Sequence, residues 1–183
     1  ANITLLGTGG GTLASTLFHW LPTATIQTVD IRQAVFQVAQ QYFSLPRDKR
    51  LSTHVSDAAD FLRQTETGQC DLLICDLYLA DGLDPLVLQS DFLDLCERHL
   101  SAHGWLVLNL WKEHREQTDC LEQLKQRFPQ LLQSTTTDGN WILWASKYAE
   151  IADKKNARDR CVQRAPLAGF NLWSVVKGFY RHR

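Results

Sequence analysis

A glycine-rich turn between two short apolar runs constrains the fold of this chain more than any other feature. The run at residues 3–6 is followed by Gly-Thr-Gly-Gly-Gly-Thr at residues 7–12 and by a helical pattern, and the run at residues 25–29 ends at Asp30. This order predicts a strand, a glycine loop, a helix, a second strand and an acid, which is the opening βαβ unit of a nucleotide-binding fold. Glycines allow the sharp turn and let a ligand lie against the backbone.

The spacing of the glycines distinguishes two classes of cofactor. The dinucleotide fingerprint G-x-G-x-x-G requires a third glycine where this chain has Thr12. The spacing G-x-G-x-G is met by Gly7, Gly9 and Gly11, and it resembles that of the class I S-adenosylmethionine-dependent transferases. The carboxylate of Asp30 could accept hydrogen bonds from both hydroxyls of a ribose. A tight turn that binds no ligand is the alternative interpretation.

The rest of the chain predicts alternating strands and helices. Periodicity and capping signals predict helices at residues 12–21, 33–43, 58–64, 90–100 and 113–128. Apolar runs and alternation predict further strands at residues 51–56, 72–75, 105–110, 131–136 and 141–146. Ser90 should cap the fourth helix, His103-Gly104 should form a turn, and the turn at residues 138–140 should join the last two strands as a hairpin. We therefore expect an α/β fold with a doubly wound, mostly parallel, seven-stranded Rossmann-like sheet and an antiparallel strand near one edge.

Three of the expected strands end in an aspartate, at Asp30, Asp57 and Asp76. Ligands of open α/β sheets bind beyond the carboxyl ends of the strands. Each aspartate alone could cap the helix that follows it, but three of them at one edge beside the glycine loop favour a shared ligand site. In that site Asp30 would hold ribose hydroxyls, Asp57 would meet the adenine amino group, and Asp76 would face the reacting centre.

Four segments in this order resemble the spermidine synthase-like branch of the class I S-adenosylmethionine transferases, at residues 6–13, 29–31, 55–58 and 70–78. The resemblance extends through residues 107–111 to about residue 146. It implies transfer of an aminopropyl group from decarboxylated S-adenosylmethionine to an amine such as putrescine, with Asp76 as the catalytic carboxylate. A carboxylate can orient the amine and accept its proton during attack on the carbon beside the sulfonium. No metal is required, because the sulfonium supplies the leaving group.

The motif positions give a set of candidate site residues. For the cofactor, S-adenosylmethionine or its decarboxylated form, they are Gly7, Thr8, Gly9, Gly10, Gly11, Asp30, Ile31, Asp57 and Ala58. For the substrate they are Tyr78, Asp81 and Trp111, of which Tyr78 and Trp111 could equally be packing residues at the rim. For Cys96, His99 and His103 we expect a structural or surface role and not a zinc site.

Departures from the family pattern keep other functions open. The loop at residues 7–12 lacks the acid with which polyamine synthases contact the aminopropyl amine. Leu79 stands where these synthases have a second aspartate, for which Asp81 or Asp84 could substitute. The sequence also begins directly at the first expected strand, without the N-terminal β-hairpin region of these synthases. The alternatives are a methyltransferase that uses S-adenosylmethionine on an unknown acceptor, and a degenerate module that binds without catalysis.

Charge and composition divide the chain in two. Residues 151–183 contain eight Lys or Arg and two Asp or Glu, a net charge of +6, so the preceding residues carry −7. We expect a transferase domain at residues 1–147 and a basic, helical C-terminal extension at residues 148–183. The extension could hold RNA or an acidic partner, but a solvated or self-packed helix is the favoured interpretation.

Composition also predicts the compartment and the partners. The five cysteines form no C-x-x-C motif, which favours free thiols in a reducing cytoplasm. No apolar run reaches the length of a membrane span. The sequence contains no methionine, so we expect that the natural chain is processed or longer. The expected partners are a small-molecule amine or other acceptor and a possible second copy in a homodimer, with no membrane and no nucleic acid.

Overall fold

A seven-stranded sheet forms the centre of the molecule in the computed structural model, which describes residues 1–116, 118–136, 139–148 and 154–177. The strand order is β3-β2-β1-β4-β7-β9-β8, and β9 runs antiparallel to both of its neighbours while the other pairs are parallel. The predicted doubly wound, mostly parallel sheet is therefore confirmed. The strands are β1 (Asn2–Leu6), β2 (Thr25–Asp30), β3 (Leu51–Val55), β4 (Cys70–Cys75), β7 (Leu100–Trp111), β8 (Gln130–Thr135) and β9 (Asn140–Ser146).

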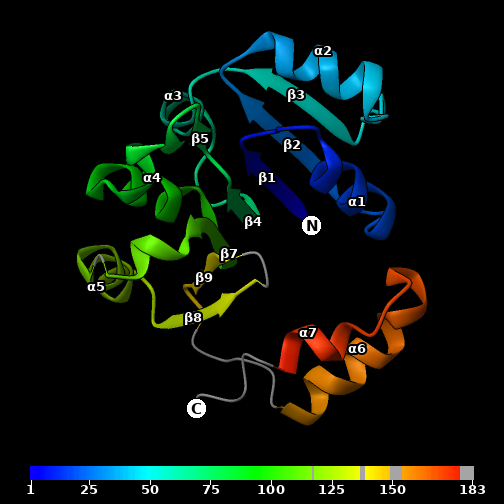
Figure 1. Cartoon of the computed structure of the whole chain (residues 1–183), viewed down its shortest axis with the longest axis vertical. Helices are drawn as coiled ribbons and strands as arrows, with labels where there is room; N and C mark the ends of the chain where they lie inside the picture. The colour runs from blue at the N-terminus through cyan, green and yellow to red at the C-terminus, as the bar shows by residue number, and fades with distance from the viewer. Residues whose placement is uncertain (117, 137–138, 149–153, 178–183) are drawn as a thin grey trace.

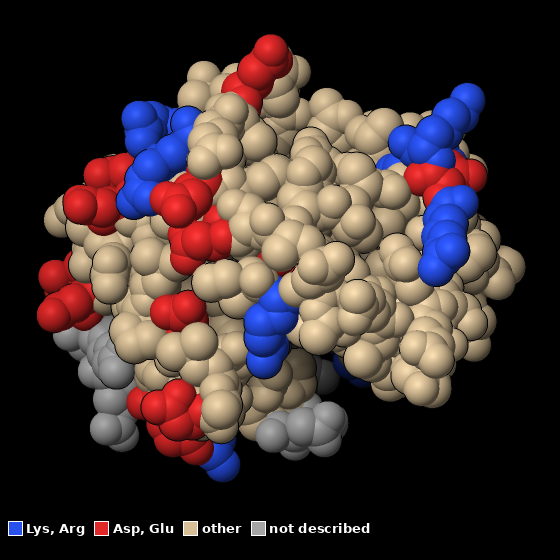
Figure 2. Space-filling view, turned by 90° about the horizontal axis from the view of Figure 1, so that it is seen from above, with Lys and Arg blue, Asp and Glu red and all other residues tan. Residues whose placement is uncertain are grey.

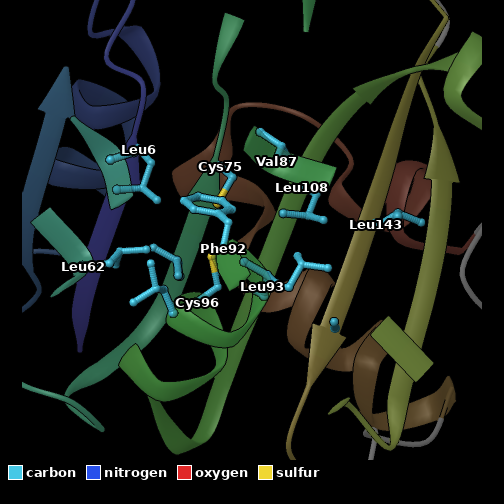
Figure 3. Close-up of a cluster of buried hydrophobic side chains, with 14 of the residues drawn as sticks. Leu6, Leu62, Cys75, Val87, Phe92, Leu93, Cys96, Leu108 and Leu143 are labelled. Carbon is cyan, nitrogen blue, oxygen red and sulfur yellow. The ribbon is translucent and has the colours of Figure 1, made fainter. Parts of the chain in front are cut away.

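Helices cover both faces of this sheet (Figure 1). One face carries α1 (Thr12–Trp20) and α2 (Gln33–Tyr42), and the other carries α3 (Ala58–Gln64), α4 (Ser90–His99) and α5 (Thr118–Arg127). Two hydrophobic clusters result, because alternate residues of a strand point to opposite faces. On the second face Phe92 of α4 packs among Leu6, Cys75 and Leu108 (Figure 3). This packing fixes the level at which β1 and β4 end.

Three local predictions are corrected by contacts from distant parts of the chain. Ser90 does not cap α4: Gln89 holds the N-cap position, and the Ser90 hydroxyl instead accepts a hydrogen bond from Arg127 at 2.7 Å. His103-Gly104 is no turn between elements, because β7 is continuous and the extra residues form an irregularity opposite β4. The helix expected at residues 113–128 is a 3-10 turn, η2 (Lys112–Glu116), followed by α5. Residues 117 and 138 lie outside the described residues.

The segment between β4 and α4 is more ordered than the expected loop. It contains a short antiparallel hairpin of β5 (Tyr78–Leu79) and β6 (Gly82–Leu83), and then the 3-10 helix η1 (Pro85–Leu88). The backbone N–H of Asp84 donates to the carbonyl of Leu77 at 3.1 Å, which closes the hairpin back onto the end of β4. The hairpin therefore stands at the carboxyl edge of the sheet.

The described C-terminal part consists of α6 (Lys154–Ala168) and α7 (Leu172–Val176). Between them Phe170 lies against Trp20 of α1, with ring centroids 6.2 Å apart. In the face seen from above, basic side chains occur in separate groups and not as one continuous surface (Figure 2). No helix within the described ranges is long and apolar enough to cross a membrane.

Gly7 lets its backbone lie directly against that of Asp76. Its φ is +90°, and a Cβ at this position would lie 2.1 Å from the carbonyl oxygen of Asp76. The Gly7 N–H donates to the carbonyl of Val29, and the Asp76 N–H donates to the carbonyl of Leu6, both at 2.8 Å. The carboxyl ends of β1, β2 and β4 therefore converge at this glycine.

Substitution of Gly7 by alanine should be far more costly than substitution of Gly9. In Gly7→Ala the new Cβ meets backbone that cannot yield, so we expect the free energy of unfolding in urea to fall by about 4 kcal/mol or the chain to remain unfolded. Gly9 also has a positive φ, of +51°, but a Cβ there would have no neighbour within 4 Å. Gly9→Ala should therefore cost only about 1–2 kcal/mol, the strain of a left-handed residue. Equal losses in the two variants would contradict this interpretation.

Candidate functional site

A cavity of about 350 Å³ lies at the carboxyl edge of the sheet, beyond β1, β2, β3 and β4. Its volume is within the range of sites that bind small molecules. It lies where ligands of doubly wound folds bind, at the edge where the glycine loop leaves β1. Its lining consists of Gly7, Gly9, Val29, Asp30, Ile31, Arg32, Ser56, Asp57, Ala58, Asp76, Leu77, Tyr78, Leu79, Ala80, Asp84 and Leu86.

Asp30 is held firmly at the end of β2. Its side chain is 8% exposed, and its two oxygens accept backbone hydrogen bonds from Thr8 at 3.2 Å and from Arg32 at 3.0 Å. The guanidinium of Arg32 lies 3.7 Å away, and the hydroxyls of Thr8 and Thr28 share a hydrogen bond of 2.6 Å. Each carboxylate oxygen has a second lone pair, so Asp30 can still accept hydrogen bonds from a ligand in the cavity.

Asp57 caps the helix α3 and also lies at the cavity. One of its carboxylate oxygens caps α3 by accepting hydrogen bonds from the N–H groups of Ala59 at 2.8 Å and Asp60 at 3.0 Å. The residue also lines the cavity, together with Ser56 and Ala58. The cap fixes the carboxylate, so any ligand would meet it in one orientation.

Asp76 stands at the end of β4 with one oxygen engaged. Its Oδ1 accepts a hydrogen bond of 2.8 Å from Nδ2 of Asn109, and Oδ1 of Asn109 accepts one of 2.9 Å from Nδ2 of Asn140. We call these three residues the carboxylate–amide chain. Oδ2 of Asp76 has no hydrogen-bond partner among the residues that the structure describes. It can therefore meet a substrate.

Tyr78 connects the β5–β6 hairpin to the wall of the cavity. Its hydroxyl donates to the carbonyl of Asn109 at 3.0 Å, and its ring packs on Trp111 with centroids 5.6 Å apart. Burial, and to a smaller degree the charge of Asp76, raises the pKa of Tyr78 to about 12. The phenol thus remains protonated at neutral pH and acts as a hydrogen-bond donor.

Several candidates lie outside the cavity. Trp111 stands behind Tyr78, and Asp81, at the turn of the hairpin, is exposed and does not contribute to the lining. Asp84 does line the cavity, and its Oδ1 accepts from the N–H of Leu86 at 2.9 Å. In the glycine loop, Thr8 supports Asp30 instead of lining the cavity, and a Cβ on Gly10 or Gly11 would face Phe43 or Leu45 of the neighbouring segment.

The structure adds residues to the site that the sequence did not identify, chiefly Arg32, Ser56, Asn109 and Asn140. The only sequence signal for Asn109 is a polar residue inside the apolar run at residues 107–111. Asn140 gives no such signal, because its place depends on strand pairing.

The cysteine and the two histidines considered for metal binding have structural contacts. The ring of His103 packs against that of Tyr148, with centroids 4.6 Å apart. His99 is buried, and its Nε2 lies 3.2 Å from the hydroxyl of Thr4. Cys96 is fully buried in the hydrophobic cluster around Phe92. In the described part of the chain, no group of three or more His, Cys, Asp or Glu side chains is placed to hold a metal ion.

Comparisons with known proteins give a consistent family. The spermine/spermidine synthase domain matches residues 2–150. A polyamine aminopropyltransferase of Chromobacterium violaceum is 33% identical over 69% of this chain and 49% of the relative. An eEF1A lysine and N-terminal methyltransferase homolog of Drosophila melanogaster is 30% identical over 96% of this chain and 27% of the relative. The chain thus spans about half or less of these two curated relatives.

A solved structure supports the fold. The crystal structure of human methyltransferase-like protein 13 in complex with SAH has a TM-score of 0.76 and 24% identity, and the match covers 85% of this chain and 77% of that chain. At this level of identity the match shows the architecture alone.

The titration of Tyr78 offers a direct test of the site geometry. We expect the phenol to ionise near pH 12, because its ring is partly buried and Asp76 is nearby. The difference in ultraviolet absorbance between the wild type and Tyr78→Phe, followed from pH 8 to pH 13, isolates this group. Since the pKa is raised above that of the unfolded chain, the contribution of Tyr78 to stability is present below about pH 10 and is lost as the pH rises through about 12. Ionisation near pH 10 would contradict the arrangement.

Proposed function

The chain belongs to the spermine/spermidine synthase family, and we propose that it is a transferase that moves an alkyl group from an S-adenosylmethionine-type sulfonium to an amine. The observation that carries this proposal is a cavity lined by two carboxylates, Asp30 and Asp76, that differ in burial and in hydrogen bonding. Asp30 is buried and fixed by backbone amides, whereas Asp76 is exposed and has one oxygen without a partner among the described residues. The first suits recognition of a nucleoside, and the second suits an acceptor.

The end of the cavity that is lined by Asp30, Asp57 and Ala58 would fit a nucleoside. Asp30 would accept hydrogen bonds from the ribose hydroxyls, and Asp57 and Ala58 would meet the adenine. A Cβ on Gly9 would project into open space, so its backbone is accessible to the ligand that the cavity would hold. When bound, the sulfonium group would supply a carbon with a good leaving group beside it.

At the other end, Asp76 would act on the acceptor. The amine nitrogen needs a free lone pair to form the new bond to carbon while the carbon–sulfur bond breaks and its electrons go to sulfur. Oδ2 of Asp76 would orient the amine and take up its proton. Tyr78, whose hydroxyl is committed to the carbonyl of Asn109, would form a side wall.

We infer that the group transferred is aminopropyl and that the acceptor is an amine such as putrescine. The polyamine aminopropyltransferase relative supports this inference. So does Asp84, a further carboxylate at the acceptor end of the cavity. The five free cysteines fit a reducing, cytoplasmic location, and we retain the homodimer as part of the proposal.

Methyl transfer from S-adenosylmethionine is the second candidate, because residues 7–12 contain no acid that would neutralise an aminopropyl ammonium. The methyltransferase homolog from Drosophila melanogaster supports this alternative. The two cofactors differ by one carboxylate, so direct binding measurements separate the candidates.

Calorimetric titration with S-adenosylmethionine and with its decarboxylated form should show tighter binding of the decarboxylated form. Incubation of that complex with putrescine should then give spermidine, detected by mass spectrometry. Binding of the intact form alone would decide for a methyltransferase. Binding of neither form would contradict both candidates.

Asp30→Asn should weaken cofactor binding by at least tenfold, since loss of hydrogen bonds to a charged group costs about 1.5–3 kcal/mol. The amide would also turn an NH2 group against the N–H of Thr8 or Arg32. Asp48→Asn is the matched control, because Asp48 accepts from the N–H of Arg50 at 2.8 Å and lies 3.7 Å from its Nε, outside the cavity. Equal affinities in the two variants would exclude Asp30 from the site.

Asp76→Asn should leave cofactor affinity unchanged and reduce kcat by about a hundredfold or more, the usual contribution of a general base. Asp71→Asn serves as the control, because Asp71 lies on the same strand at the opposite edge of the sheet and is also hydrogen-bonded. Steady-state kinetics with the better cofactor provide the measurement. A fully active Asp76→Asn enzyme would remove Asp76 from the mechanism.

A further inference from the structure

We propose that Asn109 is a positioning residue for Asp76, and that Asn140 holds the Asn109 amide with its NH2 group toward the carboxylate. The inference rests on the proposed function, in which Asp76 acts at the acceptor. It concerns two residues that lie outside the lining of the cavity and whose side chains connect to it through Asp76.

The direction of the hydrogen bonds in the carboxylate–amide chain is fixed by chemistry. An ionised carboxylate can only accept, so Asn109 must present its NH2 group to Asp76. Its carbonyl oxygen then points the other way, where Nδ2 of Asn140 donates to it at 2.9 Å. If Asn140 donated nothing, only the carboxylate of Asp76 would oppose an Asn109 amide that is turned over. Donation from Asn140 thus reinforces the productive orientation.

The two asparagines stand on the adjacent, hydrogen-bonded strands β7 and β9. In the antiparallel ladder Asn109 pairs with Ile142 and Asn140 pairs with Trp111, so the two are diagonal neighbours on one face. The backbone of Asn109 is further held at its carbonyl by the hydroxyl of Tyr78. A side chain on such a frame can hold a partner to the small tolerances that catalysis requires.

As a consequence, the two carboxylate oxygens of Asp76 have different roles. The side chain is exposed and directly follows the last residue of β4, so without the Asn109 contact it could adopt other rotamers. The Asn109 amide engages Oδ1 at 2.8 Å and leaves Oδ2 for the amine. The conformation that the reaction needs is therefore set before any acceptor arrives.

Nuclear magnetic resonance of the Asn side-chain amides tests the chain without any turnover. In 15N-labelled protein at constant pH, the NH2 signals of Asn109, assigned by their absence in Asn109→Ala, should shift in Asp76→Asn, because the charged acceptor of their hydrogen bond is lost. Asn140→Ala should move or broaden the same signals, because the Asn109 amide then loses one of its two hydrogen-bond partners.

Gln133→Ala is the matched control for the loss of a side-chain contact in the β8–β9 strand pair. Gln133 accepts a hydrogen bond from the indole of Trp141 at 3.1 Å, so this variant removes a side-chain contact between β8 and β9 without touching the carboxylate–amide chain. Its Asn109 signals should match those of the wild type. If Asn140→Ala and Gln133→Ala have the same effect, or if the Asn109 signals ignore Asp76, the proposal is overturned.

Kinetics provide the second test. Asn109→Ala should lower kcat about tenfold to a hundredfold at unchanged cofactor affinity, and Asn140→Ala should do the same to a smaller degree. Because Asn140 acts through Asn109, the double variant should be no slower than Asn109→Ala alone. Asn109→Asp should shift the pH dependence of kcat to higher pH, since two adjacent carboxylates resist ionising together. Additive losses, or an unshifted pH profile, would contradict the positioning role.

The two tests fail separately. If the wild type transfers no group from either cofactor, the proposed function is wrong, and the resonance experiment still decides whether the two amides control Asp76. If transfer occurs but the asparagine variants retain full kcat, the function stands and the positioning role is refuted.

Discussion

The contact between two backbones at Gly7 is the constraint on which the rest of the site depends. The carbonyl of Asp76 occupies the space that any side chain at residue 7 would need. With the chain turned in this way, the N–H of Thr8 donates to the carboxylate of Asp30, and the N–H of Gly7 donates to the carbonyl of Val29 in β2. Three strands can end at one point only because this one residue has no Cβ. The cavity is the space that remains beyond that point.

Much of the fold could be predicted because its signals are local. The glycine loop, the apolar runs and the strand-end acids each reflect a few consecutive residues, and the alternation of strands and helices then implies a doubly wound sheet. The errors came where a distant partner decides the outcome. The hydroxyl of Ser90 is used by Arg127, 37 residues away, and not by its own helix. The strand β7 does not begin after a turn at Gly104, because β4 pairs with residues on both sides of the irregularity.

The residues of the site also fall into those that local sequence signals could predict and those that they could not. Asp30, Asp57 and Asp76 could be placed at one edge from strand ends alone, and the structure brings all three to the cavity. Asp81 and Trp111 could not be placed, because the segment after β4 folds into a hairpin that directs Asp84, and not Asp81, to the cavity. The hydrogen bond from Asn140 to Asn109 could not be predicted from neighbouring residues in the sequence. Asn140 reaches Asp76 only because β9 inserts between β7 and β8.

The order of the cavity residues along the chain separates the two ends of the site. In the proposed function the nucleoside end uses residues 7–58, whereas the acceptor end uses residues 76–86 with Asn109 and Asn140 behind them. Among the described residues, no side-chain hydrogen bond joins the two ends. Mutations accumulating after residue 76 could therefore remodel the acceptor end while the nucleoside end is inherited intact. A single ancestral architecture could diversify in this manner into relatives named for different group transfers, as the aminopropyltransferase and methyltransferase matches are.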